Sequence, residues 1–440
     1  MSSTTRSRPT AAPNTARAAV AASTIGSVLE YYDFFVFGTL SALVFGELFF
    51  PSENTAVSAL LSLSSFAVGF VARPLGGILL GHFGDKIGRK PLLLFTFLLT
   101  GIVTVLMGVL PTYAQIGLAA PLLLVLLRIL QGIGIGGEWG GAALLAVEHA
   151  PEEKKGLYGS LVQAGAPIGV ILSTGSVAIL TATLTREQLL AWGWRLPFLA
   201  SALLLAVGLF LRFKVAESPE FLEVKTEKSE EKYPVWLAIR QYPKQIATAV
   251  LIHMSDTTLG LIQGVFILGY ASGALGMDPT IVLLANLFSS VMNLITTPIA
   301  GALGDRYGQR RIVSIGLVGL ALWAFPAFRL IETAQVSSLF LAMGIGGMLV
   351  GWLFAGQATL FAAFFPAKVR YSGMSLGFQL GTVLGGGFGP LIAQALTDAA
   401  DGSTWTVSLY VLAVAAAAFI ATRTVQPIHS DDPAELREEK

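Results

Sequence analysis

The sequence contains no cysteine, only four histidines and few charged side chains. The absence of cysteine excludes disulfides, thiolate nucleophiles and thiolate-bound iron–sulfur or zinc centres. The histidines, His82, His149, His253 and His429, are far apart in the chain, which argues against a histidine-rich metal site. Charged residues make up 12% of the chain, against about 25% in a typical soluble domain. The shortage of charge therefore argues against a soluble multi-domain protein.

Long apolar runs dominate the sequence instead. Of the 440 residues, 54% are hydrophobic, and the mean hydropathy is +0.71. Twelve runs are long enough, at ~1.5 Å per helical residue, to cross a hydrocarbon layer ~30 Å thick. We place them at approximately 19–45, 57–80, 91–110, 120–147, 157–183, 192–212, 245–272, 279–301, 311–331, 336–362, 371–397 and 404–423. The predicted fold class is an all-α polytopic membrane protein with twelve transmembrane helices.

The distribution of positive charge predicts the orientation of these helices. If the N-terminus is cytosolic, all but five of the 28 lysines and arginines fall in cytosolic segments. The exceptions are Arg186, Arg195 and Arg329 outside, and Arg73 and Arg128 within runs. This bias follows the positive-inside rule, so we expect both termini in the cytosol and the protein in the inner or plasma membrane of a bacterium. Arg73 and Arg195 lie near span ends, and we expect them to extend toward the headgroups.

A polar interruption divides the chain into two halves. The segment 214–244 carries mixed charges and separates the sixth run from the seventh, which is typical of a solvated linker. A short sequence is also repeated: GHFGDKIGRK starts at Gly81, after the second run, and GALGDRYGQR starts at Gly301, after the eighth. Repeated halves are typical of secondary transporters. The expected organisation is a disordered cytosolic tail (1–17), a six-helix bundle (18–213), a cytosolic linker (214–244), a second, pseudo-symmetric six-helix bundle (245–424) and a cytosolic tail (425–440).

The fourth run carries polar groups in an otherwise apolar helix. Arg128, Gln131 and Trp139 share one face, with Glu138 beside it. A charge near mid-membrane costs roughly 2.5–3.5 kcal/mol on insertion scales, so it is expected to face a partner or a water-filled path. We expect Glu138 and Trp139 to border such a cavity, although the indole of Trp139 could instead only pack against neighbouring helices.

Glycines are spaced by four along the same run, at Gly132, Gly136 and Gly140 and again at Gly137 and Gly141. Part of this stretch matches the dinucleotide fingerprint G-x-G-x-x-G, but that fingerprint needs a strand before it and a helix start after it. We interpret the glycines as ridges that let neighbouring helices approach closely.

Two carboxylates lie near the middle of the first run. Glu30 and Asp33 are three residues apart and share a helix face. They could lie in the headgroup region, or form a proton or substrate site, and we favour Asp33 as the proton carrier. Arg128 could be their counter-ion or that of Glu138, or it could bind a substrate carboxylate through two parallel hydrogen bonds.

The second half offers a matching set of polar residues. His253 and Asp256 are one turn apart in the seventh run, and Gln263 lies two turns further on the same face. We expect His253 to be solvated or interfacial, and Asp256 and Gln263 to lie deeper. Gln357 and Gln379 could complete the second wall of a site, or serve as hydrogen-bonding groups between helices.

Several segments carry a family resemblance. The repeated loop resembles the signature loop of the major facilitator superfamily, and Arg128-Ile-Leu-Gln131-Gly132 is similar to an element of its fourth helix. Other segments resemble the metabolite:proton symporter family, which includes shikimate, α-ketoglutarate, citrate and proline/betaine permeases. These segments are LEYYDFF from Leu29, RPLGG from Arg73, GGEWGG from Gly136 and WRLPF from Trp194.

The resemblance implies the superfamily's two-bundle fold and a gate. The repeated loops would act as a cytosolic latch across the interface between the halves when the outside is open. The residues expected in this latch are Gly81, Asp85, Arg89, Gly301, Asp305 and Arg306.

We therefore predict a proton-coupled symporter that imports a small organic acid, such as shikimate or a di- or tricarboxylate, by alternating access. Its expected partners are the substrate, protons and the bilayer; we expect a monomer, no nucleic acid, no metal, and no cofactor other than the proton gradient. The expected proton-coupling residues are Asp33, Glu30, Glu138 and Arg128. The expected substrate-binding residues are Arg128, Tyr31, Tyr32, Gln131, Trp139, Asp256, Gln263, Gln357 and Gln379.

Two alternatives stay open. A zwitterion carrier of the proline/betaine type could bind a cationic group on an aromatic face made by Tyr31, Tyr32 and Trp139. A transporter-like receptor would bind solute without moving it. A membrane enzyme is disfavoured, because the sequence shows no nucleophile–base pair and no metal cluster.

Overall fold

The computed structural model describes residues 13–53, 55–87, 89–213 and 234–426, and every regular element in these ranges is helical. The predicted tails and linker fall mostly on residues 1–12, 214–233 and 427–440, which lie outside the described part of the chain. Helix α1 begins at Pro13, before the expected end of the N-terminal tail.

The first half contains six crossings. Its elements are α1 (Pro13–Leu40) continuing through η1 (Ser41–Phe45) into α2 (Gly46–Phe49); α3 (Thr55–Ile87); α4 (Arg89–Val109); the short α5 (Tyr113–Ile116); α6 (Ala119–His149); η2 (Glu152–Lys154), α7 (Lys155–Gln163) and α8 (Gly165–Thr183); and α9 (Arg186–Gln188), η3 (Leu189–Gly193) and α10 (Arg195–Phe213).

The second half repeats this pattern. Its elements are α12 (Pro234–Gln241); α13 (Pro243–Leu261), η4 (Ile262–Phe266) and α14 (Ile267–Gly273); α15 (Pro279–Tyr307); α16 (Gln309–Glu332); α17 (Val336–Ala355) and α18 (Gln357–Ala362); α19 (Arg370–Gly381), η5 (Thr382–Gly387) and α20 (Gly389–Ala399); and α21 (Trp405–Thr424). Helix α12 occupies the described end of the expected linker.

Each of the twelve predicted runs corresponds to a helix or to a helix with a short break. Within the described ranges, nine helices are long and apolar enough to cross a membrane, and two more crossings are bent pairs. Helix α3 supplies the remaining one through a shorter apolar stretch, Ser64–Leu80. The prediction of an all-α bundle of twelve transmembrane helices is confirmed.

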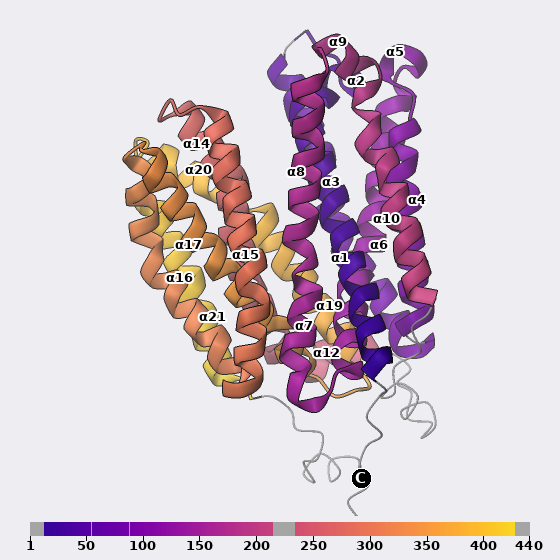
Figure 1. The fold of residues 1–440 in the computed structure, drawn as a ribbon, viewed down its shortest axis with the longest axis vertical. Helices are drawn as coiled ribbons and strands as arrows, with labels where there is room; N and C mark the ends of the chain where they lie inside the picture. The colour runs from indigo at the N-terminus through magenta and orange to yellow at the C-terminus, as the bar shows by residue number, and fades with distance from the viewer. Residues whose placement is uncertain (1–12, 54, 88, 214–233, 427–440) are drawn as a thin grey trace, which may run out of the picture.

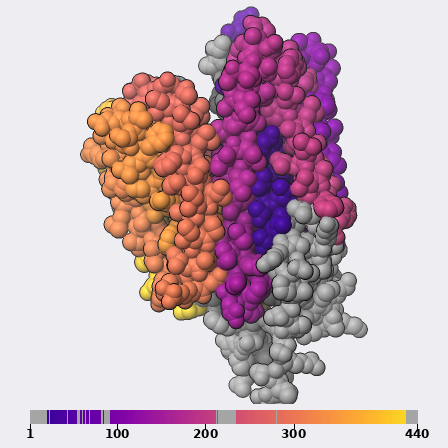
Figure 2. All heavy atoms as spheres, viewed as in Figure 1, coloured from indigo at the N-terminus to yellow at the C-terminus, as the bar shows by residue number. Residues whose placement is uncertain are grey.

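The two halves touch at one end and separate toward the other (Figure 1). At the end where α7, α12 and α19 lie, α19 packs against α3 and α6, and α15 packs against α7 and α8. We call this the closed end. Toward the opposite end, the open end, α14 and α20 of the second half diverge from α2 and α9 of the first, and the surface is hollowed between the halves (Figure 2).

Helices α3 and α6 cross at very short distance because glycine lines their contact. A β-carbon on Gly136 would lie 2.1 Å from the carbonyl oxygen of Arg73, and one on Gly132 would lie 2.4 Å from that of Gly69. The opposite surface is equally tight, since a β-carbon on Gly76 would meet the carbonyl oxygen of Ile133 at 2.1 Å. All three glycines are packing residues, as predicted for Gly132 and Gly136, and the close crossing fixes how Arg73 and Arg128 are presented.

This crossing can be tested with a pair of glycine substitutions. Gly136→Ala forces a methyl group into the backbone of α3, and overpacking of this kind typically costs about 1–3 kcal/mol. Gly175→Ala on α8 is the matched control, since nothing lies within 4 Å of its added methyl and alanine favours helix by about 1 kcal/mol over glycine. We expect Gly136→Ala to lower the melting temperature of the detergent-purified protein and Gly175→Ala not to. Equal melting temperatures would contradict the close packing.

Candidate functional site

A cavity of about 130 Å³ lies between the two halves. Helices α1, α3 and α8 form one wall, and α13, η4, α15, α17 and η5 form the other. Four of the residues expected in the site, Glu30, Tyr31, Asp256 and Gln263, line this cavity together. The structure therefore brings groups from both halves to one place in the middle of the bundle.

Irregular helix turns position several of the lining side chains. Gln263 lies in η4 and Thr382 in η5, and both are π-helical segments within longer crossings. A π turn widens the helix by one residue and is frequent at functional sites. In α3, Pro74 follows Arg73. Because proline has no backbone N–H, the carbonyl one turn earlier lacks its usual helical hydrogen bond.

Arg73 and Glu30 form a buried ion pair on the cavity wall. Arg73 Nη1 lies 3.5 Å from Glu30 Oε1, and the two side chains are 7% and 3% exposed. The guanidinium also lies 5.1 Å from the ring centres of both Phe34 and Phe70, a cation–π arrangement. The expectation that Arg73 extends to the headgroups is wrong. Helix α3 continues to Ile87, beyond the predicted end of the run, and this places Arg73 well inside the bundle.

Asp33 and Arg128 are joined through a chain of hydrogen bonds inside the first half. Thr104 donates to Asp33 Oδ2 at 2.6 Å, Gln131 donates to the Thr104 hydroxyl at 2.7 Å, and Arg128 donates to Gln131 Oε1. Arg128 also donates to the carbonyl of Phe66 at 3.2 Å. Asp33, Arg128 and Gln131 are thus connected as a buried set, but they lie outside the cavity lining.

The remaining expected residues of the first half take up other places. Tyr32 donates to the carbonyl of Pro197 at 3.0 Å within its own half. Glu138 is buried on α6 and interacts electrostatically with Glu30 and Asp33. Trp139 lies at the interface between the halves and is described below with its partners.

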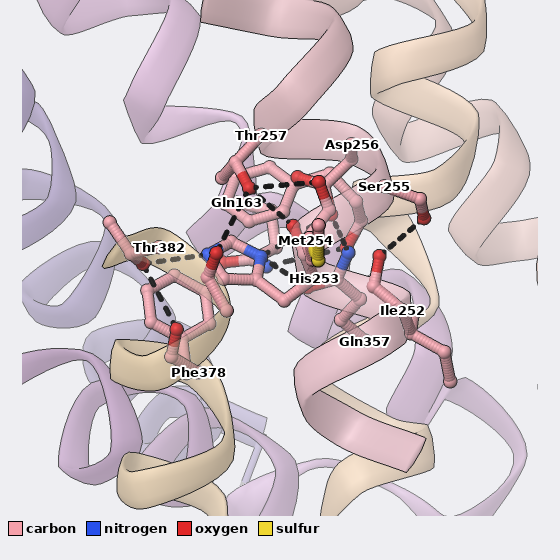
Figure 3. Close-up of polar contacts among 12 residues, drawn as sticks. Gln163, Ile252, His253, Met254, Ser255, Asp256, Thr257, Gln357, Phe378 and Thr382 are labelled. Atoms are coloured by element: carbon pink, nitrogen blue, oxygen red, sulfur yellow. Dashed lines mark hydrogen bonds and ion pairs between the residues drawn. The ribbon is translucent and has the colours of Figure 1, made fainter. Parts of the chain in front are cut away.

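The second half holds a buried histidine–carboxylate cluster (Figure 3). His253 Nδ1 lies 3.0 Å from Gln357 Oε1 and 3.3 Å from Asp256 Oδ1, while Nε2 lies 2.9 Å from the hydroxyl of Thr382. Gln357 in turn donates to Asp256 Oδ1 at 2.5 Å. His253 is 0% exposed, so the expectation of a solvated or interfacial histidine is wrong. The reason is that α18 and η5 pack over α13 at this level.

Aromatic stacking joins this cluster to the first half. The ring of Phe378 lies between Trp139 and His253, with centroids 3.7 Å apart on each face. The indole of Trp139 donates to Gln163 at 2.8 Å. Nearby, Gln379 donates to the carbonyl of Gly136 at 3.1 Å, so it bridges the halves. Trp139, Gln357 and Gln379 are therefore interface or second-wall groups behind the cavity.

The cavity also contains polar residues that our sequence reasoning missed. Besides Arg73 and Thr382, they form a row on α15: Asn286, Ser289, Ser290 and Asn293. Their spacing of three, four and seven is a polar helix face within an apolar run, and this signal is present in the sequence. Ser289 donates to Gln263 Oε1 at 3.3 Å, which connects the row to η4.

One of the repeated loops contacts the opposite half. Asp305, at the end of α15, accepts hydrogen bonds from the backbone N–H groups of Gly156 at 2.5 Å and Leu157 at 2.8 Å. These two groups belong to the first turn of α7, where a helix favours a negative charge. A β-carbon on Gly301 would clash with Ser160 of α7, so the two helices meet closely there.

Of the other expected latch residues, only Arg306 has a described side chain. Arg306 is exposed, with its guanidinium 5.3 Å from the ring centre of Tyr307. The surroundings of Gly81, Asp85 and Arg89 lie outside what the structure describes.

Comparisons with known proteins identify the family. The profile of the family "Sugar (and other) transporter" matches residues 18–235, and that of the "Major Facilitator Superfamily" matches residues 246–439. The shikimate transporter of Escherichia coli (strain K12) is 38% identical over 401 residues, covering 90% of this chain and 92% of that protein. The chain belongs to the major facilitator superfamily. It is a multi-pass membrane transporter of small molecules, not an enzyme.

Other relatives in the superfamily agree with the metabolite:proton symporter motifs. The inner membrane metabolite transport protein YhjE of Escherichia coli (strain K12) is 38% identical and covers 93% of each chain. The proline/betaine transporter of Salmonella typhimurium (strain LT2) is 31% identical, covering 88% of this chain and 78% of that protein. Among solved structures, the proton:xylose symporter XylE bound to 6-bromo-6-deoxy-D-glucose superposes with a TM-score of 0.75 at 19% identity, covering 93% and 96% of the two chains. This last similarity shows the fold.

The contact between Asp305 and α7 predicts a change in accessibility at the closed end. Asp305→Ala removes two hydrogen bonds to a charged acceptor, each worth about 1.5–3 kcal/mol. A cysteine at Ser160, which is 0% exposed and faces Gly301, can report on opening because the chain contains no other cysteine. We expect Asp305→Ala to raise the labelling rate of S160C by a membrane-impermeant thiol reagent roughly tenfold or more.

Asp278→Ala is the control for this measurement. Asp278 also caps a helix start, accepting from the N–H of Thr280, but within one half. It should leave the labelling of S160C unchanged. Unchanged labelling in Asp305→Ala as well would show that Asp305 does not hold the halves together.

Proposed function

We propose that this transporter is a proton-coupled symporter that imports a small organic acid by alternating access. The observation that carries the proposal is the Arg73–Glu30 ion pair, which is buried yet lines the cavity between the halves. A buried arginine whose only described carboxylate partner can be neutralised by a proton is suited to exchange that partner for a substrate carboxylate. The name of the shikimate transporter relative supports an organic acid as the cargo.

The coupling step follows from the arrangement of these two residues. When Glu30 takes up a proton, Arg73 loses its counter-ion, and an uncompensated buried charge is strongly unfavourable. A substrate carboxylate can then restore neutrality and form two parallel hydrogen bonds with the guanidinium. Loading of proton and substrate thus becomes mutually dependent, and a carrier that rocks more readily when loaded or empty than when half loaded is a symporter.

The buried set of Asp33, Gln131 and Arg128 supplies a second ionisable group behind this pair. Glu138 connects this set to the Arg73–Glu30 pair, because its carboxylate repels the carboxylates of both Glu30 and Asp33 when they are ionised. We assign Asp33 and Glu138 to proton coupling. We assign Arg128 to balancing their charge, because its described contacts lie inside the first half.

The second wall of the cavity suits a hydroxylated acid. Amides and hydroxyls from Asn286, Ser289, Ser290 and Asn293 face the space opposite Arg73 and can donate to or accept from substrate hydroxyl groups. A molecule with a carboxylate at one end and hydroxyls at the other would satisfy both walls.

The orientation in the membrane follows from charge. Among the described residues, the helix ends and connections at the closed end carry Lys154, Lys155, Arg240, Lys244, Arg306, Arg310, Arg311, Lys368, Arg370 and Arg423. By the positive-inside rule this end faces the cytosol, so the open end faces outward, where substrate and proton enter together.

A zwitterion carrier is the second candidate. Asp256 lines the cavity opposite Arg73, and Tyr31 lines it as well. A substrate with a carboxylate at Arg73 and a cationic nitrogen near Asp256 and Tyr31 would fit this arrangement. Two relatives are proline/betaine transporters, one of them 31% identical.

Uptake into proteoliposomes tests the proposed coupling, with shikimate as the first probe and proline and glycine betaine as the second. We expect Glu30→Gln to abolish accumulation driven by an inward proton gradient while leaving substrate counterflow active. Arg73→Gln should weaken the apparent affinity for the acid by about 10–100-fold, the effect of losing a charge-assisted hydrogen bond. Glu187→Gln and Arg240→Gln, which alter exposed charges, are the controls.

Three results would contradict the proposal or replace it. Gradient-insensitive uptake by the unaltered protein would exclude proton coupling. Competition by betaine but not by organic acids would favour the zwitterion carrier. Ligand-induced thermal stabilisation without accumulation would indicate a receptor.

For the buried set of Asp33, Gln131 and Arg128, we predict a different pattern of substitution effects. Asp33→Asn should reduce gradient-driven uptake, because it removes an ionisable group, whereas Arg128→Gln should lower the melting temperature and the transport rate together. Neither should change the apparent affinity as strongly as Arg73→Gln, since neither residue lines the cavity. An affinity loss in Arg128→Gln equal to that in Arg73→Gln would instead place substrate at Arg128.

A further inference from the structure

The geometry points to His253 as a second proton-binding site of this carrier, in the opposite half from Glu30 and Asp33. The site would bind a proton on Nε2 of the imidazole, with the Asp256 carboxylate as the counter-charge. Its role in transport rests on the proposed function, but proton binding itself does not.

The hydrogen-bond partners of Nδ1 fix one of the two ring hydrogens. Gln357 donates its amide hydrogen to Asp256, so it turns its amide oxygen toward the ring. Both neighbours of Nδ1, Gln357 Oε1 and Asp256 Oδ1, are then acceptors. Nδ1 therefore carries a hydrogen in either charge state, and Nε2 is the atom that gains or loses a proton.

The partner of Nε2 can serve both charge states without moving. The Thr382 hydroxyl has one hydrogen and lies 2.9 Å from Nε2 and 3.0 Å from the carbonyl of Phe378. When Nε2 is bare, the hydroxyl hydrogen can point to it. When Nε2 is protonated, the hydroxyl can accept from it and turn its own hydrogen to Phe378 (Figure 3). Protonation thus needs only a rotation of one O–H bond.

The position of His253 lets protons reach its ring from the cavity side only. Asp256, its ion-pair partner, and Thr382, its hydrogen-bond partner, both line the cavity, so a proton can reach the ring from there. Toward the first half at the closed end, the ring is covered by Phe378, and Phe378 is covered by Trp139. When the closed end opens, the two halves part between Trp139 and Phe378, which would strip Trp139 from the stack and leave Phe378 as the ring between His253 and the newly opened space.

The surrounding helices leave Asp256 as the main charge partner of the ring. Helices α17 and α18 and the η5 segment contain no ionisable side chain. Titratable groups on neighbouring elements include Glu138 on α6, Arg370 and Tyr371 on α19 and Arg423 and Tyr410 on α21, and those that line the cavity with Asp256 are Glu30 and Tyr31 on α1 and Arg73 on α3. Tyr31 interacts electrostatically with Asp256, and Tyr371 donates to the carbonyl of Gly137.

Nitrogen NMR of the full-length protein tests proton binding directly. The protein, labelled with ¹⁵N-histidine and held in nanodiscs, is recorded over a pH series, and its four histidines are assigned by replacing them one at a time. We expect the His253 signals to change from a neutral ring with hydrogen on Nδ1 to an imidazolium as the pH falls. In Asp256→Asn the ring should stay neutral at pH values where the unaltered protein is charged. A ring that stays neutral throughout would overturn the inference, and assignment through the other three histidines keeps the test valid if His253→Gln does not fold.

Transport stoichiometry tests the role of the site. His253→Gln keeps a polar group at this position but cannot become charged, so we expect about one proton fewer per substrate with counterflow retained. His149→Gln is the control, since His149 is buried near the end of α6 with Nδ1 on the carbonyl of Leu145. Unchanged stoichiometry in His253→Gln would overturn the coupling role. Absence of gradient-driven uptake in the unaltered protein would instead count against the proposed function. The NMR experiment would still decide whether His253 binds a proton.

Discussion

The structure depends on keeping the described charged groups at the centre of the bundle next to partners. A lone charge away from water is costly, so each one must be matched by a carboxylate, an amide or an aromatic face. Arg73 has Glu30 and two phenylalanine rings, Arg128 reaches Asp33 through Gln131 and Thr104, and Asp256 has Gln357 and the ring of His253. A charged cargo or a proton that enters the cavity can take over one of these partnerships.

The helix packing decides which of these groups meet the cargo. The α3–α6 crossing is close enough to exclude a methyl group, and it presents Arg73 to the cavity while Arg128 turns into the first half. The second half builds its wall differently, with π turns in η4 and η5 and a polar row on α15. The two halves therefore share a topology, but they do not share a chemistry: one offers an arginine–carboxylate pair and the other a histidine–carboxylate cluster with neutral hydrogen-bonding groups.

The sequence was sufficient for the fold because its signals are local. Apolar length and positive charge between runs identify each crossing without knowledge of its neighbours, and the glycine spacing correctly indicated close packing. The site was predicted less well because burial depends on where helices end and which faces meet. Arg73 was misplaced since α3 extends beyond its apolar run, and His253 was misplaced since α18 and η5 cover it. The row from Asn286 to Asn293 could have been found by the same periodicity that identified the helices.

The closed end adds a further constraint, because polar and aromatic contacts there accompany an apolar cluster that continues from Leu80 and Leu144 of the first half to Ile246 and Met374 of the second. Asp305 holds the start of α7, Gln379 reaches the carbonyl of Gly136, and Trp139 stacks on Phe378. Water can satisfy the groups in the two hydrogen-bonded contacts, whereas separating Trp139 from Phe378 and opening the apolar cluster exposes apolar surface and costs free energy. Because Phe378 belongs to both the interface and the His253 stack, the state of the interface and the surroundings of the histidine cannot change independently.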